Sequence, residues 1–186
     1  MESWAEKYRP ESLSDIIGNT KVINDLKTWA KSWGDKMVKK GVILSGPPGC
    51  GKTSAAIALA NDMEWEVIEL NASDARSGAV IEGTALRAGL FQTFGSKGLA
   101  DRNLILLDEA DNLYERAKQS KNKTKNYSDR GGKRAITKTL EQTRQPVIIT
   151  VNDLYNLTKG TGSKIKRLCL NLKFQRPSVI SIATVL

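Results

Sequence analysis

The chain has 186 residues and a formal net charge of +9, with 29 Lys and Arg against 20 Asp and Glu. Apolar residues make up 40% of the sequence, which is ordinary for a globular protein, and the length suits one sizeable core. No apolar run approaches the roughly 20 residues that span a bilayer, and Glu2 and Glu6 stand where a signal peptide is basic and apolar. Two cysteines and no histidine exclude a disulfide framework and His-based catalysis. We therefore expect a cytoplasmic protein with no membrane partner.

The first predicted elements are a helix and a strand, separated by a short polar stretch. Apolar residues recur at helical spacing from Val22 to Trp33, which predicts one amphipathic helix. The run from Val42 to Leu44 predicts a short buried strand.

The sequence from Gly46 to Thr53, Gly-Pro-Pro-Gly-Cys-Gly-Lys-Thr, is a complete GxxxxGK(S/T) motif between this strand and an Ala-rich helix pattern. In that context backbone N–H groups and the positive end of a helix meet at one spot, which suits a triphosphate. We expect Lys52 to reach the β and γ phosphates and the Thr53 hydroxyl to ligate Mg²⁺. A Gly-Pro turn with an incidental Lys is the alternative. The residues expected to bind the nucleotide here are Gly46, Pro47, Pro48, Gly49, Cys50, Gly51, Lys52, Thr53 and Ser54.

A strand pattern from Glu66 to Leu70 precedes a second buried strand, Asn103 to Leu107, which ends in Asp108-Glu109-Ala110-Asp111. Its continuous apolar stretch is typical of a parallel strand, and we expect it to lie beside the phosphate-loop strand. Its carboxyl end then brings acids into the site. Asp108 is expected to hold the magnesium through water, and Glu109 to orient or deprotonate the attacking water. An acidic turn after a core strand is the alternative.

The segment from Glu115 to Arg134 carries eight basic residues against two acids. Its part from Lys118 to Ser128 has a composition that does not bury enough surface to fold alone, so it reads as a solvated loop. The functional alternative is that Lys133 and Arg134, at the start of the following helix, meet DNA phosphates together with Arg130. Few aromatic residues occur here, so such binding would be directed to the DNA backbone.

A third buried strand, Val147 to Val151, ends in Asn152. A polar side chain at the tip of a strand beside the acids is placed to touch the γ phosphate or the water, and a solvated Asn is the alternative. We expect a loop after it, and then an edge strand with one wetter face. The apolar positions of that strand are Leu168, Leu170, Leu172 and Phe174.

Helix and strand patterns alternate along the chain, which predicts an α/β fold with a parallel sheet covered by helices on both faces. The phosphate loop, the Asp-Glu strand and the Asn-tipped strand together resemble the AAA+ ATPases. The resemblance implies a P-loop NTPase with a five-stranded parallel sheet, and ATP and Mg²⁺ as cofactors. The catalytic residues that it implies are Lys52, Asp108, Glu109 and Asn152. The letters of residues 108–111 also match the DEAD-box helicases, a resemblance that nothing else in the sequence supports.

The amino-terminal string Trp-Ala-Glu-Lys-Tyr-Arg-Pro, residues 4–10, and the segment up to Gly18 resemble the opening of the clamp loaders of the replication factor C family. In that family the segment packs over the adenine, which carries over to Tyr8, Arg9, Pro10, Ile16, Ile17 and Gly18. Residues 71–77 and 129–132 look like motifs of the large-subunit branch. Leu168 stands where small subunits carry a finger Arg, and Arg167 points to the other face if this segment is a strand. The resemblance implies a subunit whose ATP site receives an arginine finger from a neighbouring subunit and which supplies no such arginine itself.

The resemblance also implies a domain division and partners. Residues 1–176 correspond to a nucleotide-binding domain and residues 177–186 to the start of a helical lid, so we expect a fragment. The implied partners are small subunits of replication factor C, a PCNA-type sliding clamp and primer-template DNA. A helix in this part of the fold inserts into the clamp, which suggests that role for Leu90, Phe91 and Phe94; packing against the chain's own sheet is the favoured alternative.

The function implied by the resemblance is ATP-driven opening of the clamp and its loading at primer-template junctions. Three alternatives remain at this point: a checkpoint or repair AAA+ ATPase that acts on DNA, a DEAD-type helicase, and a DNA-binding module with an inactive ATP site.

Overall fold

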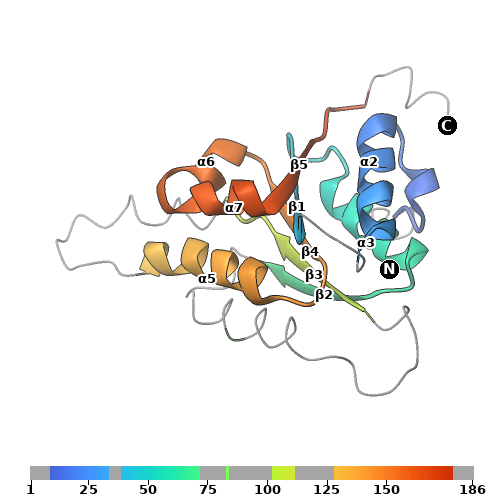
Figure 1. Ribbon diagram of the computed structural model, residues 1–186. Helices are drawn as coiled ribbons and strands as arrows, with labels where there is room; N and C mark the ends of the chain where they lie inside the picture. Colours follow the sequence, from blue (N-terminus) through green and yellow to red (C-terminus); the bar gives the residue numbers. More distant parts are fainter. Residues whose placement is uncertain (1–8, 34–38, 72–82, 84–101, 112–127, 178–186) are drawn as a thin grey trace, which may run out of the picture.

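A computed structural model describes residues 9–33, 39–71, 83, 102–111 and 128–177. Five parallel strands form one sheet in the order β2-β3-β4-β1-β5, with helices on both faces (Figure 1). This confirms the predicted fold class. In chain order the strands are β1 (Gly41–Ser45), β2 (Glu66–Asn71), β3 (Asn103–Asp108), β4 (Val147–Val151) and β5 (Cys169–Lys173).

Two separate cores lie on the two faces of the sheet, because successive side chains of a strand point to opposite faces. On one face, Val42 and Leu44 of β1 pack with α2 (Thr20–Lys31) and α3 (Lys52–Asp62). On the other face, Ile43 packs with a second layer of helices. This layer comprises α5 (Ser128–Gln142), α6 (Leu154–Thr158), a short 3-10 turn (Gly160–Gly162) and α7 (Ser163–Leu168). None of the described helices is long and apolar enough to cross a membrane.

The prediction that the strand with the acids lies beside the phosphate-loop strand is wrong. β3 does not lie beside β1, because β4 pairs with both of them: Leu107 of β3 is opposite Ile149, and Leu44 of β1 is opposite Thr150. The three strands are equally apolar and almost equal in length, so composition alone does not order them within a parallel sheet.

The segment after β4 is helical, where a loop was predicted. Helix α6 begins after Asp153, whose side chain accepts a hydrogen bond from the Tyr155 amide at 2.8 Å. Helices of five or six residues are too short to show a helical period, which explains the wrong prediction. Leu168 is the last residue of α7, and Arg167 lies exposed on that helix instead of on a strand face.

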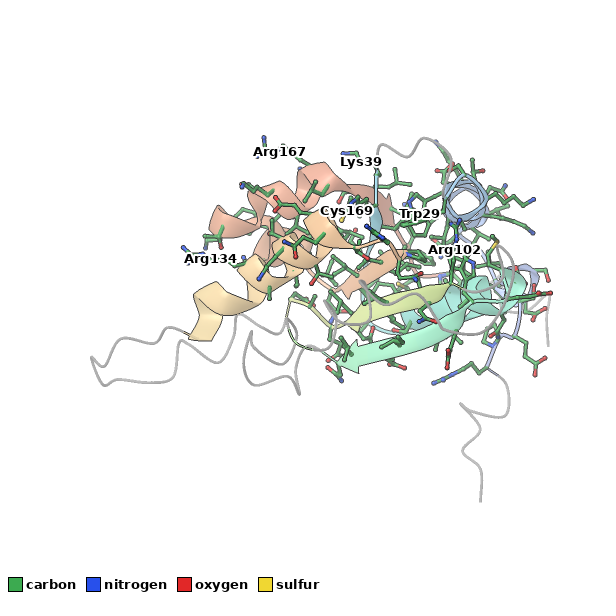
Figure 2. The ribbon with its side chains drawn as sticks, turned by 60° about the horizontal axis from the view of Figure 1, so that its bottom comes forward. Trp29, Lys39, Arg102, Arg134, Arg167 and Cys169 are labelled. Carbon is green, nitrogen blue, oxygen red and sulfur yellow. The ribbon has the colours of Figure 1, made fainter. Side chains whose placement is uncertain are left out.

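The edge strand β5 begins at Cys169, which is buried. Burial raises the pKa of its thiol to about 12, although the nearby Lys39 opposes this shift. The thiol therefore stays protonated at neutral pH and serves packing, not nucleophilic chemistry. The Lys39 ammonium donates to the carbonyl of Arg167 and ties the approach to β1 to the end of α7; Figure 2 labels all three residues.

Helix α5 begins at Ser128, so Gly131 and Gly132 lie inside a helix that was predicted to start after them. Each Gly inside a helix costs about 1 kcal/mol relative to Ala, so the sequence alone predicts a helix start after the two glycines. Tertiary packing can override this penalty. Gly132 is buried in the structure.

Lys133 is a buried lysine with a structural role. Its side chain is 4% exposed, and its ammonium donates to the carbonyls of Asn156 at 2.6 Å and Lys159 at 3.0 Å. Burial, and to a lesser degree the charge of Lys159, lower the pKa of Lys133. These bonds join α5 to the end of α6. They contradict the expectation that Lys133 meets DNA phosphates, because its donors are directed into the protein.

We predict that Lys133→Met destabilises the fold. Met keeps the apolar stem but removes a donor from the carbonyls of Asn156 and Lys159, of which the second keeps the amide of Gly162. The loss costs about 1 to 3 kcal/mol of unfolding free energy. Urea unfolding measures this loss, with Arg134→Met as the control, since Arg134 is the next residue of α5 and is exposed. Equal stability of the two variants would contradict a structural role for Lys133.

Candidate functional site

Three loops meet at the carboxyl edge of the sheet, where ligands of open α/β sheets bind. The loop after β1 is the glycine-rich segment, the turn after β3 carries the acids, and β4 ends in Asn152. They line an open pocket of about 200 Å³. Its lining residues are Pro48, Gly49, Gly51, Lys52, Thr53, Ser54, Asp108, Glu109, Thr150, Val151 and Asn152.

Two glycines of the loop occupy positions that other residues do not fit. A Cβ atom on Gly46 would lie 2.5 Å from the carbonyl oxygen of Phe174, and the Gly46 amide donates to Val151 at 3.2 Å. Gly51 has a φ of 92°, in the left-handed region, directly before the first residue of α3. The loop therefore runs close to the sheet and delivers the chain to a helix start, whose free N–H groups and dipole favour an anion.

Lys52 is only 8% exposed, and its ammonium has three hydrogen-bond partners. It donates to the carbonyls of Gly46 at 2.8 Å and Pro47 at 2.9 Å, and to Oδ1 of Asn152 at 3.0 Å. All three ammonium donors are thus used within the site. A phosphate that enters the pocket has to replace one or more of these partners, and its charge makes the new bond the stronger one.

Asp108 accepts two hydroxyl groups on the same carboxylate oxygen. Thr53 Oγ1 donates to Oδ1 at 2.9 Å and Thr150 Oγ1 donates to it at 2.5 Å. A hydroxyl that gives its proton to a carboxylate still offers lone pairs to a cation. Mg²⁺ binds through one or two protein oxygens and keeps waters or phosphate oxygens for its other positions, so this donor set fits it. No cluster of three or more His, Cys, Asp or Glu that could cage a metal occurs among the described residues.

Glu109 follows with a φ of 52°, a left-handed conformation that costs a residue with a side chain about 1 to 2 kcal/mol. Hydrogen bonds to β4 hold it: the Glu109 amide donates to Thr150 Oγ1 and the Ala110 amide to the Thr150 carbonyl, both at 3.0 Å. The turn therefore keeps a strained backbone because its amides are paired.

Asp111 fastens the same turn to the end of β4. Its Oδ2 accepts the amides of Asn152 and Asp153, each at 3.0 Å, and its side chain is 8% exposed. The carboxylate thereby fixes the backbone from which the Asn152 side chain extends toward Lys52.

The structure brings Lys52, Thr53, Asp108, Glu109 and Asn152 together in one pocket, as expected from their strand ends. Sequence reasoning missed Thr150 and Asp111. Thr150 is the single hydroxyl residue of an apolar strand, and Asp111 is the last acid of the turn. Both can be seen in the sequence, but neither position tells which residue it is hydrogen-bonded to.

The predicted adenine group is not part of this pocket. Pro10, Ile16, Ile17 and Gly18 are half-buried but do not line it, and a Cβ on Gly18 would contact Pro177 at 3.5 Å. The pocket of about 200 Å³ is lined by the phosphate loop and by the acid and Asn strand tips, a lining that suits phosphate groups. The placement of a base stays a prediction, and Tyr8 lies outside the described residues.

The other predicted contacts are only partly described. Leu90, Phe91 and Phe94 and the basic stretch up to residue 127 lie outside the described residues. Arg134 is exposed on α5, and Figure 2 shows it pointing outward at the edge of the molecule.

The strand order, the glycine-rich loop at a helix start, and the acid and Asn strand tips define a phosphate-loop NTPase domain. The model of the ATPase family associated with various cellular activities (AAA) matches residues 42–171, and the chain belongs to this family. The model of the Rad17 P-loop domain matches residues 1–82.

The chain is similar to archaeal proteins named replication factor C large subunit. It is 48% identical to that of Methanosarcina mazei over 92% of this chain and 25% of the relative. For Methanothrix thermoacetophila the identity is 41%, over 100% of this chain and 36% of the relative. The chain thus spans about a quarter to a third of these relatives. A solved structure of a Thermotoga maritima RuvB variant has a TM-score of 0.66 at 17% identity, over 96% of this chain and 52% of that one, and supports the fold alone.

We predict that Lys52→Ala weakens ATP binding tenfold or more, because a buried, charge-assisted bond to phosphate contributes about 1.5 to 3 kcal/mol. Titration calorimetry measures the affinity, with Lys164→Ala on the exposed side of α7 as the charge-matched control. Unchanged ATP affinity in the Lys52 variant would contradict the assignment of the phosphate loop to the ATP-binding site.

Proposed function

We propose that this chain is the ATPase part of a clamp-loader large subunit of the replication factor C type. With small subunits it opens a PCNA-type sliding clamp on ATP binding and releases it at a primer-template junction on hydrolysis. One observation carries the proposal: a complete phosphate-binding constellation lies in a chain that is similar over 92% of its length to proteins named replication factor C large subunit.

Five residues of the pocket have a role in this proposal. Lys52 turns from its carbonyl partners to the β and γ phosphates, while Thr53 and Asp108 hold Mg²⁺. When bound, Mg²⁺ neutralises charge on the phosphate oxygens. Glu109 takes a proton from the attacking water, and Asn152 orients that water or the γ phosphate.

Hydrolysis by the chain alone is expected to be weak. Among the described residues that line the pocket, Lys52 is the single cation. An arginine finger supplied by a neighbouring subunit is worth about 10³ to 10⁵ in rate, and a lid arginine adds to the same charge. The proposal therefore includes a partner subunit that completes the site, and its activity has to be measured in the assembly.

We predict that Glu109→Gln, assembled with small subunits and clamp, binds ATP normally and loses hydrolysis. The amide still accepts hydrogen bonds but is no longer a base, a change that removes about 10² to 10⁴ in rate. Phosphate release measured with and without clamp tests this, and Glu141→Gln on the exposed face of α5 is the matched control.

Full turnover in the Glu109 variant would exclude this residue as the base. Failure of the unmodified subunit to bind the small subunits, or hydrolysis that the clamp does not stimulate, would contradict the clamp-loader proposal itself. A checkpoint-type clamp loader is the second candidate, because the Rad17 P-loop model matches residues 1–82. Strand displacement would instead favour a helicase.

For DNA we propose that Arg130 and Arg134, on the first turns of α5, contact backbone phosphates. The exposure of Arg134 supports this proposal, because an exposed guanidinium can reach a phosphate, whereas the side chain of the preceding residue, Lys133, is buried. Replacing both arginines by Ala in the assembled complex should weaken binding to all sequences alike. It should also lower the slope of log affinity against log salt by about two units, one per lost contact.

Fluorescence anisotropy at several salt concentrations, with ATP present, measures this slope. Lys164→Ala with Lys166→Ala on α7 removes the same charge from exposed positions of another helix and is the control. Deletion of residues 118–125, whose composition predicts a solvated loop, should have a smaller effect, because screened charges add little attraction. An unchanged slope of log affinity against log salt in the double arginine variant would contradict the proposal that α5 contacts DNA.

A further inference from the structure

Hydrogen bonds join the acidic turn to β4 beyond the end of their strand ladder. The ladder ends at Ile149, one residue before Thr150. The Thr150 hydroxyl bonds to Oδ1 of Asp108 at 2.5 Å and to the amide of Glu109 at 3.0 Å. Its carbonyl accepts the amide of Ala110 at 3.0 Å. One residue of β4 thus contacts three consecutive residues of the turn.

The direction of these bonds follows from the chemistry of their groups. A hydroxyl has one proton to give, and the amide of Glu109 can only donate. The Thr150 oxygen therefore accepts from Glu109, and its proton goes to Asp108. Thr150 is 1% exposed, so the residue itself is shielded from solvent, while its partners Asp108 and Glu109 are half-buried.

The Asp108 carboxylate depends on this arrangement. Its Oδ1 receives hydroxyl protons from Thr53 and Thr150, which come from α3 and β4. Donors from two elements restrict rotation of the carboxylate and leave Oδ2 for the water shell of a cation. Thr53 is itself an expected ligand and can turn toward the cation, whereas Thr150 is held in a central strand.

We propose that Thr150 is a positioning residue of the nucleotide site. Its hydroxyl holds the Asp108 carboxylate and the Glu109 backbone in the orientation that receives Mg²⁺ and the attacking water. The inference rests on the proposed ATPase function and deepens it, since Thr150 acts through two residues that are expected to do the chemistry. Removing such an outer partner typically costs about 10- to 100-fold in metal affinity or activity.

The chain contains a closely matched control, Thr143, in the connection between α5 and β4. Thr143 is 3% exposed, and its hydroxyl donates to the carbonyl and accepts the amide of Gln145, both at 2.9 Å. Thr143→Val therefore removes one donated and one accepted hydrogen bond from a buried threonine, as Thr150→Val does, without touching the site.

The test uses the 186-residue chain and a fluorescent ATP analogue. For Thr150→Val we expect unchanged binding without Mg²⁺, and a rise of about 10- to 100-fold in the Mg²⁺ concentration that gives the half-maximal response. In the chain without nucleotide, the Glu109 amide should exchange its hydrogen faster, because it has lost its acceptor. Thr150→Ser should restore both properties, and Thr143→Val should change neither.

Wild-type behaviour of Thr150→Val in both measurements would overturn the inference, and so would equal changes in Thr143→Val. Absence of ATP binding in the unmodified chain would contradict the proposed function, while the exchange of the Glu109 amide would still decide whether Thr150 holds the turn. If Thr150→Val does not fold, Thr150→Ser compared with Thr150→Ala decides in the same way: equal Mg²⁺ requirements would overturn the inference.

Discussion

The position of β4 between β3 and β1 is the constraint on which the site depends. Parallel strands end at one edge of the sheet, so their order decides which loops touch. With β4 in the middle, its last residues reach both sides: Asn152 bonds to Lys52 of the phosphate loop, and Thr150 bonds to Asp108 of the acidic turn. The central strand therefore connects the cationic and the acidic halves of the pocket.

Residues of β4 and those directly after it also supply hydrogen-bond partners for the charged groups of the site. Buried charges are costly unless they are paired or hydrogen-bonded. Lys52 has carbonyl and amide oxygens as partners, Asp108 has two hydroxyls, and Asp111 has two backbone amides. Each of these partners is neutral. These bonds offset part of the cost of burying the three charged groups.

The layer of α5, α6 and α7 connects this edge to a basic surface. Asn152 leads directly into α6, whose end is bonded to Lys133 of α5, and Arg134 projects from the next position of that helix. The proposed nucleotide site and the proposed DNA contact thus lie on elements that pack on each other. Of these two adjacent basic residues, Lys133 takes part in the packing of the layer and Arg134 lies at the surface.

The sequence by itself determined the chemistry of the site, because its motifs are local. A glycine-rich loop before Lys52, acids after one apolar run and Asn152 after another can be read from neighbouring residues, and parallel strands bring such ends together. Only the tertiary structure decided which strands are neighbours, since the three runs are equally apolar. It also separated Lys133 from Arg134, because one helical step turns a side chain by about 100° and packing selects the face that is buried. The partners of Thr150 and Asp111 lie about 40 residues away in the chain, and no local pattern specifies such a pair.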